Sequence, residues 1–146
     1  MGLFSQNPNR KTQGVIAQKA FQVQSSYKMM FDGCGIEVFV NCKKTVFDGV
    51  NTLIMYENKF PKYFKKPKPS DNLNKITKEL PECEKKFVDY TLNNLERKLL
   101  NYTTDRGKIN NFNKEIDIFH YYAAEFLPET VIYFEKQIEK IFPKYQ

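Results

Sequence analysis

The sequence predicts an all-α fold of four to five amphipathic helices, joined by an extended Lys/Pro-rich connector, with at most one minor strand. Two observations lead to this prediction. Apolar residues recur at alternating steps of four and three, which places them on one face of a helix because 3.6 residues make one turn. Clusters of glycine or proline interrupt the pattern near residues 32–35 and 61–69 and at Pro128, where we expect helices to end or break.

The first 31 residues contain no Asp or Glu, although they hold four basic side chains. Their apolar positions, spaced as one helix face, are Ile16, Ala20, Val23, Tyr27 and Met30. A basic, acid-free, amphipathic N-terminus is typical of a mitochondrial import signal, and it is equally typical of an ordinary first helix with an exposed basic face. The two glycines that follow Asp32 are expected to end this helix.

Between Ile36 and Val40 apolar and other residues alternate, which favours a short strand, a loop or a helical continuation. The residues from Lys43 to Asn58 read as a second helix. Gly49 lies inside it and is expected to cost about 1 kcal/mol relative to alanine.

Residues 59–70 differ from the rest because they combine five lysines with three prolines and contain no acid. We expect an extended, partly polyproline II connector between an N-terminal basic helical region, 1–58, and a C-terminal helical region, 71–146. Lysines interleaved with rings suit phosphate groups, so this connector is the candidate partner-binding segment. Its candidate residues are Lys59, Phe60, Lys62, Tyr63, Phe64, Lys65, Lys66 and Lys68.

After the connector, the pattern predicts a short helix capped by Ser70 or Asp71 and a longer helix that begins at Pro81. Glu82 and Glu84 would lie in the first turn of the longer helix, where the helix dipole favours acids. The apolar seam of this helix is Val88, Leu92, Leu95, Leu99 and Tyr102, and residues 103–107 break it.

The strongest periodic pattern runs from Phe112 to Phe142. Its first half is Phe112, Ile116, Phe119, Ala123 and Phe126, and its second half, shifted by one residue, is Leu127, Val131, Phe134, Ile138 and Ile141. Pro128 lies at the shift, so it either kinks one long helix or begins a new one. Faces this apolar require cover from the rest of the chain or from a partner.

The net charge of +6 is uneven, because residues 1–70 carry +7 and residues 71–146 carry −1. A basic half indicates an anionic partner, which could be a nucleic acid, anionic lipid head groups or an acidic protein surface. No apolar run reaches the length that a transmembrane segment needs.

No motif for catalysis or for a cofactor is present, and we expect neither an enzyme nor a metal site. Cys34, Cys42 and Cys83 are odd in number, which favours reduced and mostly buried thiols over a disulfide framework. Their spacing does not match a zinc site, and His120, the single histidine, is expected to pack or to lie at an interface.

Together these features favour a non-catalytic accessory or scaffold subunit of a large multiprotein assembly. The expected setting is a respiratory-chain or ATP-synthase complex, peripheral to the mitochondrial inner membrane, with the cytoplasm as the other location. Its partners would be other protein subunits, with anionic lipid head groups as a further contact. The alternatives are an RNA-contacting ribosomal accessory protein and a cytoskeletal or axonemal structural protein.

Overall fold

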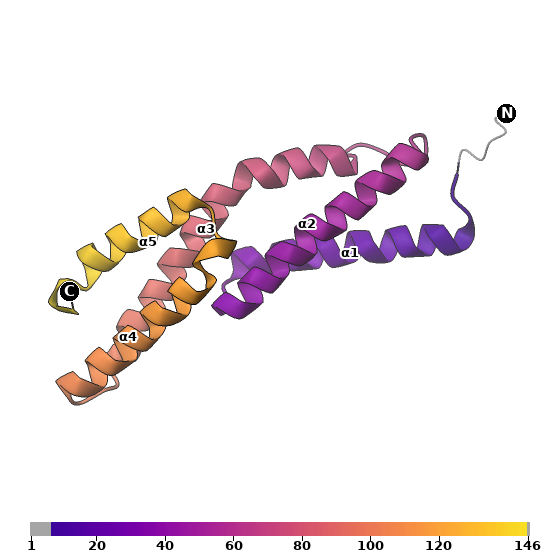
Figure 1. The fold of residues 1–146 in the computed structure, drawn as a ribbon. Helices are drawn as coiled ribbons and strands as arrows, with labels where there is room; N and C mark the ends of the chain where they lie inside the picture. The colour runs from indigo at the N-terminus through magenta and orange to yellow at the C-terminus, as the bar shows by residue number, and fades with distance from the viewer. Residues whose placement is uncertain (1–6, 146) are drawn as a thin grey trace. The chain divides into compact units, whose positions relative to one another are not determined.

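The computed structural model describes residues 7–145, and within this range it contains helices and no strand. The prediction of an all-α fold is therefore confirmed. The five α-helices are α1 (Arg10–Asp32), α2 (Ile36–Lys59), α3 (Pro69–Leu99), α4 (Asp105–Tyr122) and α5 (Pro128–Ile141) (Figure 1). Two short 3-10 helices, η1 (Ala123–Glu125) and η2 (Pro143–Tyr145), follow α4 and α5.

The chain forms two units that interleave along the sequence. The first, which we call the basic unit, joins Met1–Asp32 to Asn41–Glu79, and the second, which we call the aromatic unit, joins Gly33–Val40 to Leu80–Gln146. Helices α2 and α3 therefore each contribute to both units. The sequence analysis expected two regions that follow one another along the chain, 1–58 and 71–146. In the structure, the contacts of the basic unit group α1 and most of α2 with the start of α3.

The turn between α1 and α2 lies where the glycines predict it. Helix α1 ends at Asp32, and Gly33 has a φ of 90°, a conformation that side chains with a Cβ disfavour. A Cβ at Gly33 would also lie 2.7 Å from the ring of Tyr90. Of the three alternatives for Ile36–Val40, the structure has the helical one, because these residues form the first turns of α2.

Gly49 has a role in the basic unit that its helix propensity does not reveal. It is buried in α2, and a Cβ at this position would lie 2.4 Å from Cγ2 of Val23 in α1. The two helices can approach this closely only because Gly49 has no side chain. The other buried apolar side chains of the basic unit include Ile16, Val46, Val50, Leu53 and Ile76.

Aromatic rings form the centre of the aromatic unit. Phe39 of α2 stacks on Phe87 of α3, with ring centroids 4.3 Å apart, and both rings stack on Phe126. Phe119 of α4 stacks on Phe134 of α5 at 3.7 Å and also on Phe126. Phe119, Phe126 and Phe134 of the predicted apolar faces thus pack on one another, and Phe126 also packs on rings of α2 and α3.

The prediction that a new helix begins at Pro81 is wrong. Helix α3 is continuous over 31 residues and has Pro81 inside it. A proline in a helix interior removes one hydrogen bond and costs about 3 kcal/mol. Its neighbours Leu80, Cys83 and Glu84 are buried, and their packing offsets this cost. Pro128, by contrast, is the first residue of α5, so of the two alternatives it begins a new helix and does not kink a long one.

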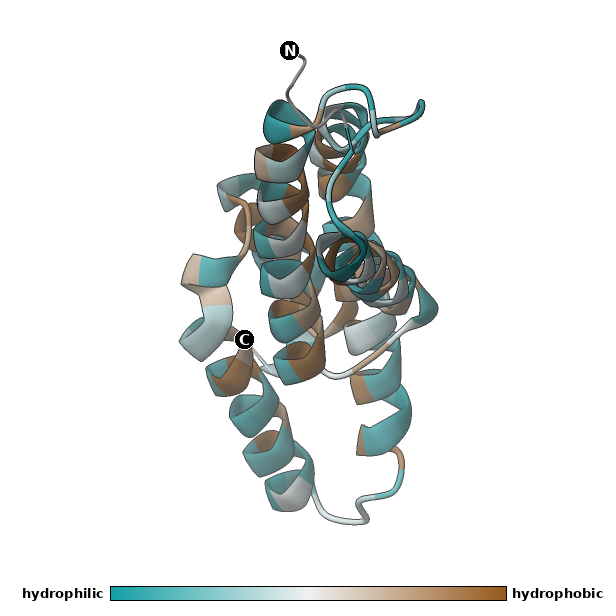
Figure 2. Cartoon of the chain, turned by 90° about the vertical axis from the view of Figure 1, so that its right-hand side faces the viewer, coloured by the Kyte–Doolittle hydropathy of each residue, from teal (hydrophilic) through white to brown (hydrophobic). Residues whose placement is uncertain are grey.

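The connector between α2 and α3 is shorter and less extended than the sequence predicts. Lys59 ends α2 and Pro69 begins α3, so the non-helical segment is residues 60–68. A turn occupies its first part, where the amide of Tyr63 donates to the carbonyl of Phe60 at 3.0 Å. Pro61 suits the second position of such a turn, which explains the departure from an extended chain. In Figure 2 this loop is mostly hydrophilic, while the helices carry hydrophobic and hydrophilic bands.

Candidate interaction site

Charge divides the two units more sharply than it divides the two halves of the sequence. The basic unit holds 13 Lys and Arg against five Asp and Glu, a net charge of +8. The aromatic unit holds ten basic against 12 acidic side chains, a net charge of −2. The anionic partner that the sequence analysis anticipated would therefore be attracted to the basic unit.

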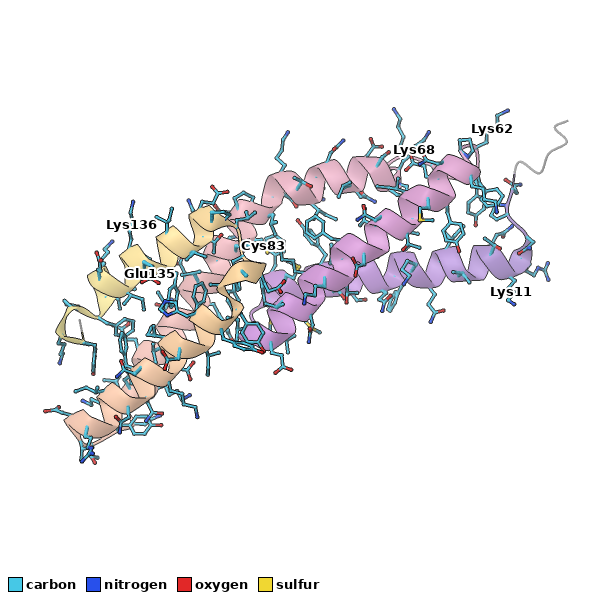
Figure 3. The ribbon with its side chains drawn as sticks, in the orientation of Figure 1. Lys11, Lys62, Lys68, Cys83, Glu135 and Lys136 are labelled. Carbon is cyan, nitrogen blue, oxygen red and sulfur yellow. The ribbon has the colours of Figure 1, made fainter. Side chains whose placement is uncertain are left out.

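Seven cations gather at one end of the basic unit, where the start of α1 and the loop after α2 lie (Figure 3). We call this surface the basic end; it consists of Arg10, Lys11, Lys59, Lys62, Lys65, Lys66 and Lys68. Lys68 is half-buried and the other six side chains are exposed. In the described part of the chain no carboxylate lies within ion-pair distance of the ammonium groups of Lys62, Lys65 and Lys66.

Two acids near the basic end accept hydrogen bonds from the backbone of the loop and of α3 and form no ion pair with the described lysines. The carboxylate of Glu57 accepts from the amide of Ser70 at 2.9 Å and from its hydroxyl at 2.8 Å. The carboxylate of Asp71 accepts from the amide of Lys68 at 3.0 Å. Pro69, between these two anchors, is buried. The loop is therefore attached firmly at the point where it enters α3.

The three rings of the predicted site are partly covered, and four of its five lysines are exposed. Phe60, Tyr63 and Phe64 are half-buried. The rings of Tyr63 and Phe64 meet edge to face with centroids 5.4 Å apart, and Nζ of Lys59 lies 5.5 Å from the centroid of Phe60. All eight residues of the predicted site belong to this one structure, in which rings support the loop and lysines form its outer surface.

The start of α1 is equally well defined. Asn9 caps the helix, because its Oδ1 accepts from the amide of Thr12 at 2.8 Å. The side chain of Gln13 donates to the carbonyl of Pro8, which is buried. The first turn of α1 contains no acid, so the positive end of the helix dipole adds to the charges of Arg10 and Lys11.

One side of α1 has no cover in the basic unit, and the sequence analysis missed its most exposed ring. Of the 23 residues of α1, only Ile16 and Met30 are buried. Phe21 is 70% exposed, and with Val15 it borders a shallow depression lined otherwise by polar side chains and Lys19. Phe21 falls outside the four-and-three spacing of the predicted apolar face, and that departure was the available signal.

The aromatic unit carries a separate open groove between the start of α2 and α4. Its volume is about 1080 Å³, and its apolar lining includes Ile36, Val38, Ile118 and Tyr121. Tyr121 is 81% exposed, so this ring is available to a binding partner. Tyr121 follows His120, which the sequence analysis expected to pack or to lie at an interface, and its ring contributes to this surface.

The remaining candidate chemical groups are His120 and the three cysteines. Nε2 of His120 lies 2.7 Å from a carboxylate oxygen of Glu135, and both side chains are about half exposed. The cysteines are thiols, with Cys42 and Cys83 buried and Cys34 half-buried. Within residues 7–145 no group of three His, Cys, Asp or Glu side chains could hold a metal ion.

Comparisons with protein-family models, with curated proteins and with solved structures found no significant match. None of the described helices combines the length and the apolar character needed to cross a lipid bilayer.

Proposed function

We propose that this chain is a non-catalytic accessory subunit that bridges protein neighbours in a larger assembly. The observation that carries the proposal is the uncovered side of α1, where Phe21 is 70% exposed. An exposed phenylalanine next to Val15, with Lys19 as the one charged side chain of the depression, supplies the aromatic anchor that protein interfaces are enriched in.

A bridging role needs more than one contact surface, and three features meet this requirement. The side of α1 around Phe21 and the basic end belong to the basic unit, and the groove beside Tyr121 belongs to the aromatic unit. The exposed pair of His120 and Glu135 suits a surface contact better than acid–base catalysis, because within residues 7–145 neither side chain forms a hydrogen bond with a nucleophilic group.

The favoured setting is the mitochondrial inner membrane, in a respiratory-chain or ATP-synthase complex. The support is the composition of the first 31 residues, which contain no acid and which form, from Arg10 onward, an amphipathic basic helix. The first six residues of this segment lie outside the described part of the chain. Fractionation of source cells tests the location, because recovery of tagged protein outside mitochondria would contradict it.

The bridging role is tested by the variant Phe21→Ser in the full chain. We expect wild-type protein to migrate in a large complex on native gels of source-cell extracts and the variant to migrate largely alone. Leu100→Ser is the matched control, because Leu100 is 76% exposed but lies at the end of α3 in the other unit. Migration of the wild-type protein as an isolated monomer would contradict the proposal.

A further inference from the structure

We propose that the basic end binds the surface of a membrane that contains anionic phospholipids. This inference deepens the proposed function by naming the chemistry of one partner. It is tested with purified protein and vesicles, so its failure would leave the bridging role of α1 untouched.

The first argument is the amount of uncompensated charge. Six of the seven basic-end side chains are exposed. Three of the five acids in the basic unit, Glu57, Asp71 and Glu79, accept hydrogen bonds from groups other than the basic-end ammonium groups, in the last case from the hydroxyl of Tyr27. Uncompensated lysines next to an anionic leaflet lie within the reach of its surface potential, which decays over about 10 Å at 0.1 M salt.

The second argument is the rigidity of the loop. Its entry into α3 is held by Glu57 and Asp71, and its rings are half-buried. The lysine backbone positions are therefore set before binding, and less conformational entropy is lost when the surface is engaged.

The third argument is the outward position of the lysines. The cavity beside the loop, of about 360 Å³, is lined by Pro67 and Pro69 together with residues of α1, α2 and α3. None of the seven basic-end side chains belongs to that lining. Lys62, Lys65 and Lys66 of the loop are also exposed, so a flat array of head groups can meet these three cations together.

The choice of lipid over RNA follows from the side chains themselves. Six of the seven cations are lysines, which are compact point charges without the fork that gives arginine bidentate phosphate contacts. Single-stranded RNA binders stack bases on open aromatic faces. Here the edge-to-face pair of Tyr63 and Phe64 and the half-buried Phe60 leave no ring fully open.

The test is co-sedimentation of the full chain with phosphatidylcholine vesicles that contain about a third phosphatidylserine. We expect binding to these vesicles, none to vesicles of phosphatidylcholine alone, and loss of binding as the salt rises from about 0.05 to about 0.5 M. The variant Lys62→Gln/Lys65→Gln/Lys66→Gln should bind about 100-fold more weakly, since each lysine near an anionic surface contributes about fivefold.

The matched control is Lys136→Gln/Lys140→Gln/Lys144→Gln, which removes the same charge from exposed positions of the aromatic unit. It should weaken binding by less than about fivefold. Both variants replace exposed side chains, and circular dichroism verifies that each retains the wild-type helix content and melting temperature.

Three results would overturn the inference. Equal losses in the two triple variants would show that net charge, and not the basic end, directs binding. Equal binding to vesicles with and without phosphatidylserine would remove the role of anionic head groups. Tighter binding to a single-stranded RNA oligonucleotide than to the vesicles at the same salt, abolished by the loop variant, would assign the basic end to nucleic acid.

Discussion

A carboxylate oxygen of Glu84 lies 2.6 Å from the hydroxyl of Thr130, and both side chains are almost completely buried. The same oxygen accepts from the amide of Leu127 at 2.9 Å. Leu127 is the N-cap residue of α5 and its side chain cannot accept a hydrogen bond. Glu84 of α3 therefore accepts from the amide of the N-cap residue, as the glutamate of a capping box does within its own helix, and it connects two helices far apart in the sequence.

Replacing either partner of this buried pair should destabilise the aromatic unit. We expect Thr130→Val and Glu84→Met each to lower the free energy of unfolding by about 1–3 kcal/mol, because a buried polar group loses its partner. Urea denaturation followed by circular dichroism measures the change, and the double variant should cost less than the sum of the single ones. The control is Glu82→Gln at an exposed neighbouring position, and an equal effect there would contradict the role of Glu84.

Replacing two helical glycines of the basic unit by alanine should change the free energy of unfolding in opposite directions. Gly14→Ala should stabilise the protein by about 0.4–1 kcal/mol, because a Cβ there meets nothing within 4 Å and alanine favours the helix. Gly49→Ala should destabilise it by about 1–3 kcal/mol, because the added Cβ would overlap the stiff side chain of Val23. Urea midpoints of the two variants provide the comparison. Stabilisation by both would show that α1 and α2 do not pack through Gly49.

Tyr133 should ionise at a higher pH than an ordinary tyrosine in a titration followed by near-ultraviolet absorbance. Its hydroxyl donates to Asp89 at 2.7 Å, and this hydrogen bond, with burial and the negative charges of Asp89 and Glu82, raises the pKa of Tyr133 to about 12. Tyr133→Phe should remove the ionisation near pH 12, and Asp89→Asn should move it to lower pH.

The same pKa predicts the sign of a stability change at high pH. In the unfolded chain a tyrosine has a pKa of about 10, so between pH 10 and 12 the unfolded state has lost the proton that Tyr133 still holds when folded. The stabilisation is complete below pH about 10 and is lost as the pH rises towards 12. Thermal melts of wild type and Tyr133→Phe should converge over this range, and a constant difference between them would contradict the assignment.

Thiol labelling should follow burial. Cys34 is half-buried, while Cys42 and Cys83 are buried. Burial also raises the pKa of Cys42, and a hydrogen bond involving Ser26 offsets this only in part, so less of the reactive thiolate is present near neutral pH. Labelling of native protein with an alkylating reagent, read by peptide mass spectrometry, should therefore modify Cys34 first. Equally rapid reaction of Cys42 and Cys34 without denaturant would show that the thiol of Cys42 is accessible, and it would contradict this prediction.

The sequence predicted well those structural features that depend on only a few neighbouring residues. The end of α1 before Gly33, the start of α5 at Pro128 and the non-helical loop rich in proline follow from backbone chemistry that needs no distant partner. The seam from Val88 to Leu99 and the apolar faces after Phe112 also predicted many buried positions, since periodicity reports which side of a helix seeks cover.

Tertiary contacts decided the points on which the sequence was silent or misleading. Pro81 lies inside α3 because its buried neighbours outweigh a local penalty, and Gly49 serves a close helix approach that propensity alone counts as a cost. The sequence analysis placed Glu84 in the first turn of its own helix, where the dipole favours an acid. In the structure its carboxylate accepts from the amide of Leu127, 43 residues further along the chain at the start of α5. The sequence determined where helices form and where charge accumulates, since both follow from neighbouring residues. Only the tertiary structure decided which side chains are covered, because burial depends on residues distant in the chain that meet when the helices pack.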